Sequence, residues 1–387
     1  MLFRRSFLIT FLLVTMLAAA FGAGYLIRAN QEAAQTHFPL LNEAYQVLET
    51  HGLKEIPRSP ALEYGMIRGM VQAYDDPYTI FVPPAQHELE SNALQGSYGG
   101  IGVSLGYDQE GNIELFPFPD SPARKAGIQD GDRLLSAGDL QVTTNTPLED
   151  VQSAIRGPEG ESVQLKIARP PDYKALQFKI VRAQFPEPSV AYHLDTAHPQ
   201  VGVIQVNLIA ASTVDEIQHA VQDMQTRGAL YFILDLRDDP GGLLTAGVDT
   251  ARLFLKDGVV IQQQYRGHAV EALQVEHPGP LVDIPLVVII NHGSASAAEI
   301  IAGALQSHHR ALLVGSPSYG KDTIQLVFDL SDGSSLHVTS AHWWIPNLNP
   351  PLAGSGLQPD VPVAPAEDSA GPDPVLQAAI AAVLKSP

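Results

Sequence analysis

The spacing of hydrophobic residues changes from one part of the chain to the next, and each spacing predicts a different kind of structure. Residues 29–96 carry apolar side chains every three or four positions, as amphipathic helices do. Residues 97–184 hold short apolar runs between turns, which is typical of a small β-rich domain. From residue 185 to 367, strand-like runs alternate with helical patterns, which predicts an α/β core, and residues 368–387 end in a helical pattern.

The first 28 residues predict an exported chain. Arg4 and Arg5 precede an uncharged run of 22 residues that ends at Ile27, close to the roughly 20 that a helix needs to cross a bilayer. A cleavable signal has a shorter apolar core of about 7–15 residues. We therefore expect an uncleaved membrane anchor with the bulk of the chain outside the cytoplasm, in the bacterial periplasm or cell envelope. Cleavage near residues 18–23 and a twin-arginine signal are the alternatives.

Three helices are expected in residues 29–96, and this small helical region offers no chemistry of its own. We interpret the apolar stripes of the first two helices as packing faces: Leu41, Tyr45 and Leu48, then Leu62, Met66 and Met70. Pro83-Pro84 opens the third helix.

The β-rich region resembles a PDZ domain of the bacterial, circularly permuted kind. Its glycines at 99, 100, 102 and 106 do not fit G-x-G-x-x-G, so a dinucleotide loop is excluded. The string S-P-A-R-K-A-G-I-Q-D-G-D-R-L-L-S (121–136) predicts a helical turn that Gly127 stops and then a strand. A short helix over 148–155 and a strand over 162–168 follow. This order of elements and these strings carry the resemblance.

A PDZ domain binds a chain terminus, because backbone N–H groups of a glycine loop hold the free carboxylate while a pocket holds the last side chain. Carried over by resemblance, the loop is Gly99, Gly100, Ile101 and Gly102. The apolar pocket would be formed by Ile101, Val103, Val151 and Ile155. The alternative is that these glycines only make a turn and the apolar residues only a core.

In the α/β region, two apolar strands each run into a turn of small residues and then a helix. Residues 230–236 lead into Arg-Asp-Asp-Pro-Gly-Gly (237–242), and residues 285–290 lead into a turn with Ser294 and Ser296. Loops at the carboxyl ends of strands are where open sheets place their sites. Upstream, Thr213-x-x-Glu216 has the spacing of a capping box.

Ser296 stands where the second of these helices should begin. The N–H groups and positive dipole end there stabilise a developing oxyanion. Ser296-x-x-Glu299 is also a capping box, and an N-cap serine needs no catalytic role.

A lysine 25 residues after Ser296 changes the interpretation of this serine. Residues 323–329 alternate, so an extended chain would place Lys321, Thr323 and Gln325 on one face and Asp322 on the other. A neutral lysine can serve a serine as its base. Lowering the lysine pKa from about 10.4 to near 7 costs roughly 4–5 kcal/mol, which burial without a carboxylate partner supplies. Gln325 would orient the amine without charging it.

Other chemistries fit less well. The string Gly315 to Lys321 matches G-x-x-x-x-G-K, but Asp322 stands where a P-loop needs Ser or Thr, and an alternating pattern follows instead of a helix. There is no G-x-S-x-G elbow and no His/acid set at metal-ligand spacing, so neither a metal nor a cofactor is predicted. The net charge of −19 and pI near 4.9 exclude a nucleic-acid role, and the absence of cysteine excludes disulfides and thiolate chemistry.

The string N-H-G-S-A-S-A-A-E-I (291–300), with Gly320-Lys321 and Gln325 after it, resembles the carboxyl-terminal processing proteases, exported serine peptidases with a PDZ domain before the catalytic core. The resemblance implies a core fold like the caseinolytic proteases and crotonases, with an inserted or preceding PDZ β-sandwich-like domain. It implies Ser296 as nucleophile, Lys321 as general base and Gln325 as the residue that positions the lysine. The oxyanion donors would be the N–H groups of Ala297 and of either Gly241 or Gly242.

The same resemblance implies cleavage of proteins near their C-termini after the PDZ domain has engaged the chain end. It also allows for an adaptor protein and for homo-oligomers formed through the terminal segments. Three departures weaken the match: Asp239 stands where the family usually has Asn, Asp322 follows the lysine where Gly is usual, and the stretch Pro346 to Gly354 is looser than usual. A catalytically inactive PDZ scaffold and a P-loop-like nucleotide binder are the alternative functions.

Overall fold

The computed structural model describes residues 16, 38–57, 59–348, 352, 354–365 and 371–385. The expected membrane anchor, residues 1–28, lies outside this part of the chain except for Met16. Within the described residues, we find no helix whose length and hydropathy would let it cross a bilayer. The chain divides into two compact units, Met1–Met70 and Val71–Pro387, which are described separately.

The first unit contains helix α2 (Pro39–His51) and most of α3 (Ala61–Tyr74). Both helices form where their apolar spacing predicts them, but neither has a buried residue. Leu48 is 59% exposed and Met70 54%. Within the described residues, the expectation that these stripes pack in a core is therefore wrong, because both helices leave their apolar side chains at least partly exposed.

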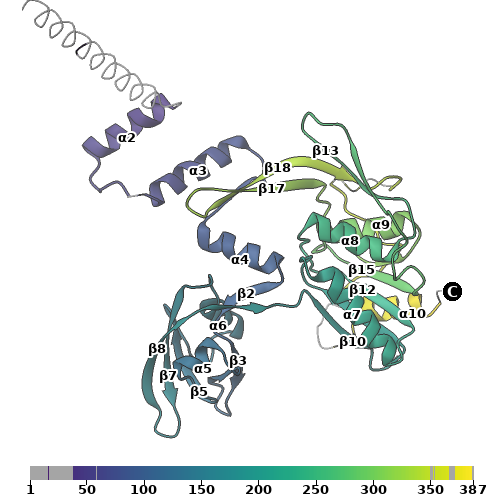
Figure 1. Cartoon of the computed structure of the whole chain (residues 1–387), viewed down its shortest axis with the longest axis horizontal. Coiled ribbons are helices and arrows are strands. Elements are labelled where there is room, and N and C mark those ends of the chain that lie inside the picture. Colours follow the sequence, from purple (N-terminus) through teal and green to yellow (C-terminus); the bar gives the residue numbers. More distant parts are fainter. Residues whose placement is uncertain are drawn as a thin grey trace, which may run out of the picture. The chain divides into compact units, whose positions relative to one another are not determined.

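The second unit begins with α4 (Pro84–Leu94) and the PDZ-like domain. Its sheet has the order β3-β4-β5-β7-β8, with β6 on β5, and a separate ribbon pairs β2 with β9 (Figure 1). The bounds are β2 Ser97–Gly100, β3 Val103–Tyr107, β4 Ile113–Pro117, α5 Pro122–Ala126, β5 Asp132–Ala137, β6 Leu140–Gln141, α6 Leu148–Ile155, β7 Ser162–Arg169, β8 Lys174–Val181 and β9 Ala183–Pro186. Gly127 ends α5 in the left-handed conformation, with φ +100°, as its position predicts.

The α/β core is built on a six-stranded sheet with the order β10-β11-β12-β15-β16-β19. All neighbours are parallel except β10 and β11. The bounds are β10 Val190–Leu194, β11 Val201–Val206, α7 Thr213–Thr226, β12 Tyr231–Asp235, α8 Leu244–Phe254, β15 Leu286–Ile290, α9 Ala297–Ser307, β16 Leu312–Gly315, β19 Val361–Pro362 and α10 Pro374–Val383.

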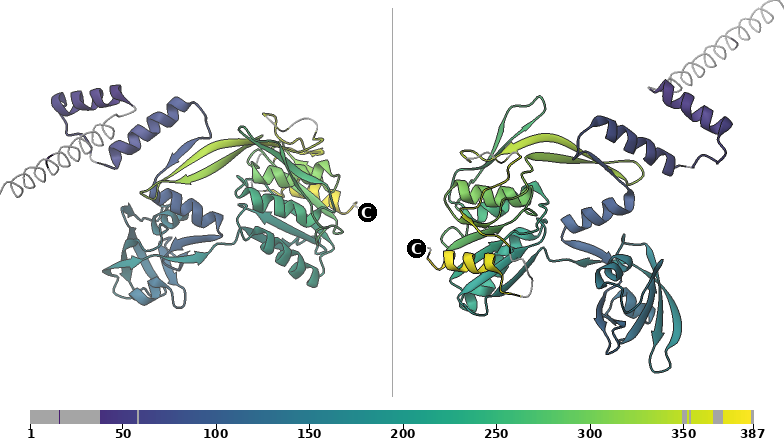
Figure 2. Two further views of the ribbon diagram at one scale, coloured as in Figure 1. Left: turned by 45° about the horizontal axis from the view of Figure 1, so that its top comes forward. Right: turned by 180° about the vertical axis from the view of Figure 1, so that it is seen from behind.

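Both faces of this sheet are buried, which explains why its central strands are continuously apolar. In β15, Leu286, Val288 and Ile290 point into the cluster that holds α7, α8 and α9. Val287 and Ile289 point into the opposite cluster, which α10 closes (Figure 2). Successive side chains of a strand face opposite sides, so one apolar run fills two cores.

A second sheet supplies the remaining wall of the site. It has the order β1-β18-β13-β14, and β17 pairs with β18. Its strands are β1 Ile80–Val82, β13 Val259–Tyr265, β14 Glu271–Gln274, β17 Thr323–Asp329 and β18 Ser335–Trp344. Ile261, Ile324 and Trp343 anchor it in the same core as α8 and α9. The β17–β18 register shifts between Ile324 and Gln325, which marks a bulge.

Candidate active site

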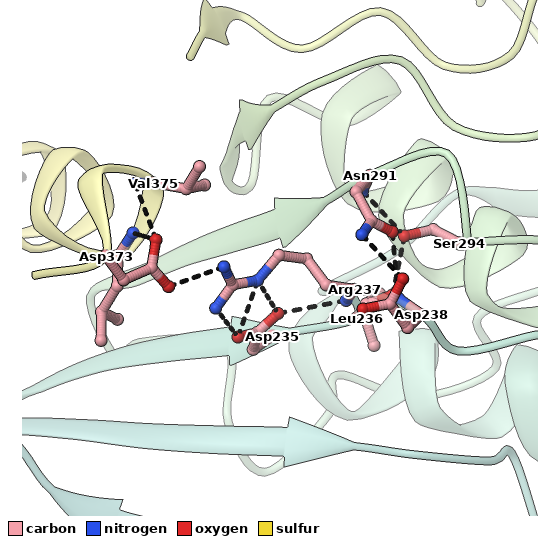
Figure 3. A network of polar contacts seen from close by, with 9 residues as sticks. Asp235, Leu236, Arg237, Asp238, Asn291, Ser294, Asp373 and Val375 are labelled. Atoms are coloured by element: carbon pink, nitrogen blue, oxygen red, sulfur yellow. Dashed lines mark hydrogen bonds and ion pairs between the residues drawn. The ribbon is translucent and has the colours of Figure 1, made fainter. Parts of the chain in front are cut away.

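The loops after β12 and β15 lie beside each other because these two parallel strands are neighbours in the sheet. Ser294 Oγ donates to the Leu236 carbonyl at 2.7 Å, and Asn291 Nδ2 donates to Asp238 Oδ1 at 2.9 Å (Figure 3). The Ala295 N–H donates to the Asp239 carbonyl at 3.0 Å. Hydrogen bonds therefore fix the glycine loop, residues 237–242, against the serine turn.

Arg237, at the start of the glycine loop, forms ion pairs with Asp235 and Asp373. Its guanidinium contacts Asp235 at 2.6 Å and Asp373, the N-cap of α10, at 2.7 Å (Figure 3). The Asp235 carboxylate raises the pKa of Arg237 above its ordinary value, and Asp373 adds to the effect. The end of β12 is thus tied to the helix that covers the opposite sheet face.

Ser296 is the N-cap of α9 and has φ +53°, which non-glycine residues rarely adopt. Such a conformation costs about 1–3 kcal/mol and persists only where its surroundings impose it. Here a Glu299 oxygen accepts from the Ser296 N–H at 2.9 Å. The glycine loop presses on the same turn, since a Cβ on Gly241 would lie 2.9 Å from the Ser296 Cβ.

The two glycines of the loop differ in whether their N–H groups have a hydrogen-bond partner. The Gly241 N–H donates to Asp239 Oδ1 at 2.9 Å. The N–H groups of Gly242 and of Ala297, the first residue of α9, make no hydrogen bond within the described part of the chain. Among the candidate donors named from the sequence, the N–H groups of Gly242 and Ala297 are therefore without a partner in the described residues, and the Gly241 N–H is not.

Lys321 lies with its amine pointing at an uncharged partner. Its Nζ donates to Gln325 Oε1 at 2.7 Å, and Gln325 Nε2 donates to the carbonyl of Tyr78. Burial lowers the pKa of Lys321, and the negative charges of Glu299 and Asp76 oppose the shift without reversing it. Within the described residues, no hydrogen bond joins the Lys321 amine to the Ser296 hydroxyl.

Asp322 does not pair with the lysine. Its carboxylate lies 3.5 Å from His342 Nδ1, and its carbonyl accepts from the Trp343 N–H. Lys321 therefore contacts Gln325 and not Asp322, as strand alternation predicts. The bulge between Ile324 and Gln325 interrupts that alternation, however, so the alternation alone does not explain the contact.

Glu299 has a larger role than its capping position indicates. It is 0% exposed, and its carboxylate accepts from Ser318 Oγ at 2.5 Å, the Gly320 N–H at 2.6 Å and the Lys321 N–H at 3.0 Å, as well as from Ser296. Burial raises its pKa, and these hydrogen bonds oppose the shift. One carboxylate thus links the backbone of the serine to the backbone of the lysine.

The contacts of Glu299 also argue against a P-loop at residues 315–321. In the G-x-x-x-x-G-K string, the Gly320 and Lys321 N–H groups donate to the Glu299 carboxylate, whereas a P-loop would use such groups to hold phosphate. Strand β17 follows the string, whereas a P-loop continues into a helix. Nucleotide binding at this string is contradicted by the fold.

A cavity of about 430 Å³ brings the predicted catalytic residues together. Ser296, Lys321 and Gln325 line it with both loop glycines. The remaining walls are mostly apolar, and they include Leu208, Leu244, Ile324, Val327 and Trp343. Glu90 and His337 add two ionisable groups that sequence reasoning did not assign to the site.

The PDZ-like domain has its own cavity, of about 270 Å³. Of the residues expected there, Gly100, Ile101, Gly102, Val103 and Ile155 line it. Gly99 and Val151 do not: Gly99 pairs with Gln184 in the β2–β9 ribbon, and Val151 is fully buried in the domain core. The lining also contains Arg156, which lies 4.3 Å from the Tyr98 ring centroid and 2.7 Å from Glu187.

Comparison with known proteins agrees with this architecture. Peptidase family S41 matches residues 200–363, and the PDZ domain matches residues 119–169. A carboxyl-terminal-processing protease of Picosynechococcus sp. is 35% identical over 300 residues, covering 77% of this chain and 72% of its own. A Synechocystis sp. protein with the same name is 35% identical over 77% of this chain and 70% of its own. A solved photosystem II D1 C-terminal processing protease covers 83% of this chain and 86% of its own, with 28% identity and a TM-score of 0.47.

An α/β core that matches a peptidase family, joined to a PDZ domain, defines a serine-type peptidase. The chain belongs to the carboxyl-terminal-processing proteases of peptidase family S41.

Proposed function

We propose that this peptidase uses Ser296 as nucleophile, Lys321 as general base and Gln325 as the residue that orients the lysine. The observation that carries the proposal is the environment of the Lys321 amine. It is partly buried, its hydrogen-bond partner is a neutral amide, and it shares one cavity with Ser296. A lysine in such surroundings can exist as the free amine that a serine requires.

The reaction follows from these positions. The neutral Lys321 amine takes the proton of the Ser296 hydroxyl as its oxygen attacks the scissile carbonyl. The N–H groups of Ala297 and Gly242 stabilise the oxyanion of the tetrahedral intermediate. The Lys321 ammonium then gives its proton to the leaving amine, and water hydrolyses the acyl ester with the lysine again as base.

The substrates that we propose are proteins cut near their C-termini. The names of the relatives support this class, and the PDZ cavity supports capture of a free chain end. In that assignment the loop Gly100 to Gly102, which lines the cavity, holds the terminal carboxylate. Val103 and Ile155 line the pocket for the last side chain, and Val151 packs in the core behind it.

The decisive experiment is digestion of unfolded casein by wild type, Ser296→Ala and Lys321→Ala, each checked for folding by circular dichroism. We expect both variants to lose activity by at least about 10³-fold, since each removes a group that the reaction needs. A substrate peptide with a free apolar C-terminus should be cut faster than its amidated form. If Ser296→Ala keeps wild-type activity, the assignment of the nucleophile is wrong.

We further propose the layout that the sequence predicts: an anchor in 1–28, a helical region in 29–96, a PDZ domain in 97–184, a peptidase core in 185–367 and a C-terminal helix in 368–387. The apolar run before residue 28 supports a catalytic part outside the cytoplasm, attached to the membrane through that segment. External protease added to intact spheroplasts should then degrade the core. We also propose that the chain binds an adaptor protein and forms a homo-oligomer. Sedimentation of the purified chain tests the oligomer.

A further inference from the structure

Asp239 is an unusual side chain to find beside an oxyanion-binding loop. It is 0% exposed, and burial raises the pKa of its carboxyl to about 7, although the hydrogen bond from Gly241 opposes the shift. Oδ1 accepts from the Gly241 N–H at 2.9 Å. Oδ2 is buried and has no hydrogen-bond partner within the described residues. A buried charge with so little compensation is strongly disfavoured relative to the protonated acid.

Within the described residues, the Gly241 N–H is the donor to the Asp239 carboxyl, so no cationic side chain compensates a charge there. On the same loop, Arg237 binds Asp235 and Asp373, and Asp238 accepts from Asn291. In the serine turn, the His292 ring lies 5.7 Å from the Tyr319 ring. Glu299 of α9 holds its own four donors, and the Lys321 amine donates to Gln325. The segment 207–212, which contacts Gly242, has no ionisable residue.

Asp239 touches both loops that carry the oxyanion donors. Its side chain binds the Gly241 N–H, and its carbonyl accepts from the Ala295 N–H at 3.0 Å, one residue before the nucleophile. By engaging the Gly241 N–H, Asp239 fixes the peptide before Gly242 and leaves the next N–H for a substrate. The same proximity means that an Asp239 charge would oppose the negative charge that develops in the reaction.

We propose that Asp239 is a positioning residue that works only as the neutral carboxylic acid: protonated, it orients the Gly241–Gly242 loop for oxyanion binding, and ionised, it switches the peptidase off. The proposal rests on the function assigned above to Ser296, Lys321 and the two backbone donors.

Lys321 and Asp239 should change the activity in opposite directions as the pH rises. Activity rises with pH as Lys321 becomes the free amine, and it falls with pH as Asp239 ionises. The wild type should therefore show a bell-shaped profile whose alkaline limb belongs to Asp239. An asparagine has the same shape and can still accept from Gly241, but it carries no charge at any pH.

The test compares full-length wild type, Asp239→Asn and Asp238→Asn by kcat/KM on unfolded casein, between about pH 5 and pH 10. Asp238 is the matched control, because it is the adjacent loop carboxylate but is solvent-exposed. We expect Asp239→Asn to lose the alkaline limb, so that its activity relative to wild type rises at least about tenfold between pH 6 and pH 9. Asp238→Asn should keep the limb.

A third variant, Asp239→Ala, separates positioning from charge. It removes the acceptor for Gly241, so it should be slow at every pH, and asparagine should restore what alanine loses. An unchanged alkaline limb in Asp239→Asn, or equal activities of the Ala and Asn variants, would overturn the role of Asp239. Either result leaves the peptidase assignment standing, because that assignment depends on the loss of activity in Ser296→Ala, measured in the same assay.

Discussion

Lys321 and Asp239 are buried ionisable side chains at the site, and burial pushes each toward its neutral form. In the roles that we propose, the neutral lysine is a base, and the neutral aspartic acid leaves no charge near the oxyanion. The partner of Lys321 matters as much as its burial. Because Gln325 is neutral, it can accept from the amine without stabilising the ammonium as strongly as a carboxylate would.

A single substitution tests this role. Gln325→Glu would place a carboxylate at the amine and raise the Lys321 pKa, so the rising limb of the pH profile should move to higher pH. At pH 7 we expect kcat/KM to fall by at least about tenfold, since one pKa unit is about 1.36 kcal/mol. The profile should be measured in the wild-type and Asp239→Asn backgrounds, so that ionisation of Asp239 does not mask the shift.

The matched control is Asp322→Asn. It changes a charge next to Lys321 in sequence, but Asp322 faces His342, so the rising limb should stay in place. If Gln325→Glu lowers activity equally at all pH values, Gln325 does not act through the protonation of the lysine.

For single residues, the sequence predicted which side chains contact each other better than it predicted the backbone geometry that brings them together. Lys321 and Gln325 do meet, but the bulge at Ile324 means that simple alternation does not explain the contact. Glu299 was interpreted as a cap because capping depends on local spacing, whereas its other bonds reach residues 19 to 22 positions away. Tyr78, whose carbonyl holds Gln325, is 247 residues away from it, and no local pattern indicates that contact.

At the scale of elements, the site depends on how closely the glycine loop approaches its neighbours. Gly242 has φ +145°, and its N–H is one of the two oxyanion donors that we propose. A Cβ on Gly242 would overlap the carbonyl of Ile209, a backbone atom that cannot move without displacing the Ile209–Gly242 bridge. The loop therefore requires glycine for space as well as for conformation.

Gly242→Ala should consequently move the loop and weaken the oxyanion site. We expect a loss of kcat of about 10²-fold or more, the range seen when one oxyanion donor is removed. KM for casein should change less, because the donors act mainly on the transition state. The measurement is steady-state kinetics at fixed pH together with the melting temperature.

Gly267→Ala is the control for this variant. Gly267 also has positive φ, +78°, but a Cβ there would meet no atom within 4 Å. It should show only the cost of an alanine at positive φ, about 1 kcal/mol in stability, with kcat unchanged. Equal kinetic effects in the two variants would mean that the clash with Ile209 is not what matters.

The start of α7 differs from the one that the sequence predicts. Thr213 and Glu216 do not form the expected capping box. Glu216 accepts from the Val190 N–H at 2.9 Å, and Thr213 Oγ1 accepts from the Ala210 N–H. Tertiary partners therefore bind both side chains, whereas Glu299 does accept from the Ser296 N–H as its capping position predicts. The spacing of a capping box shows that the local hydrogen bonds are possible, and tertiary packing determines whether they form.

At the scale of the whole molecule, α10 belongs to the peptidase core. Val375, Ala379, Ile380 and Val383 bury against alternate residues of the central strands, and Asp373 ties the start of the helix to Arg237. The apolar face of α10 is thus used within its own chain. Any assembly of copies through this end must use the outer face of the helix.

Ile380→Ala tests whether α10 holds the sheet in the single chain. The side chain is 6% exposed, and its truncation should destabilise the core by about 2–4 kcal/mol, because a buried apolar side chain leaves a cavity. Gln377→Ala, on the exposed face of the same helix, should change stability by less than about 0.5 kcal/mol. Urea unfolding followed at several protein concentrations measures both. If copies of the chain exchanged α10, the unfolding midpoint would rise with protein concentration, and the intramolecular packing described here would be wrong for the protein in solution.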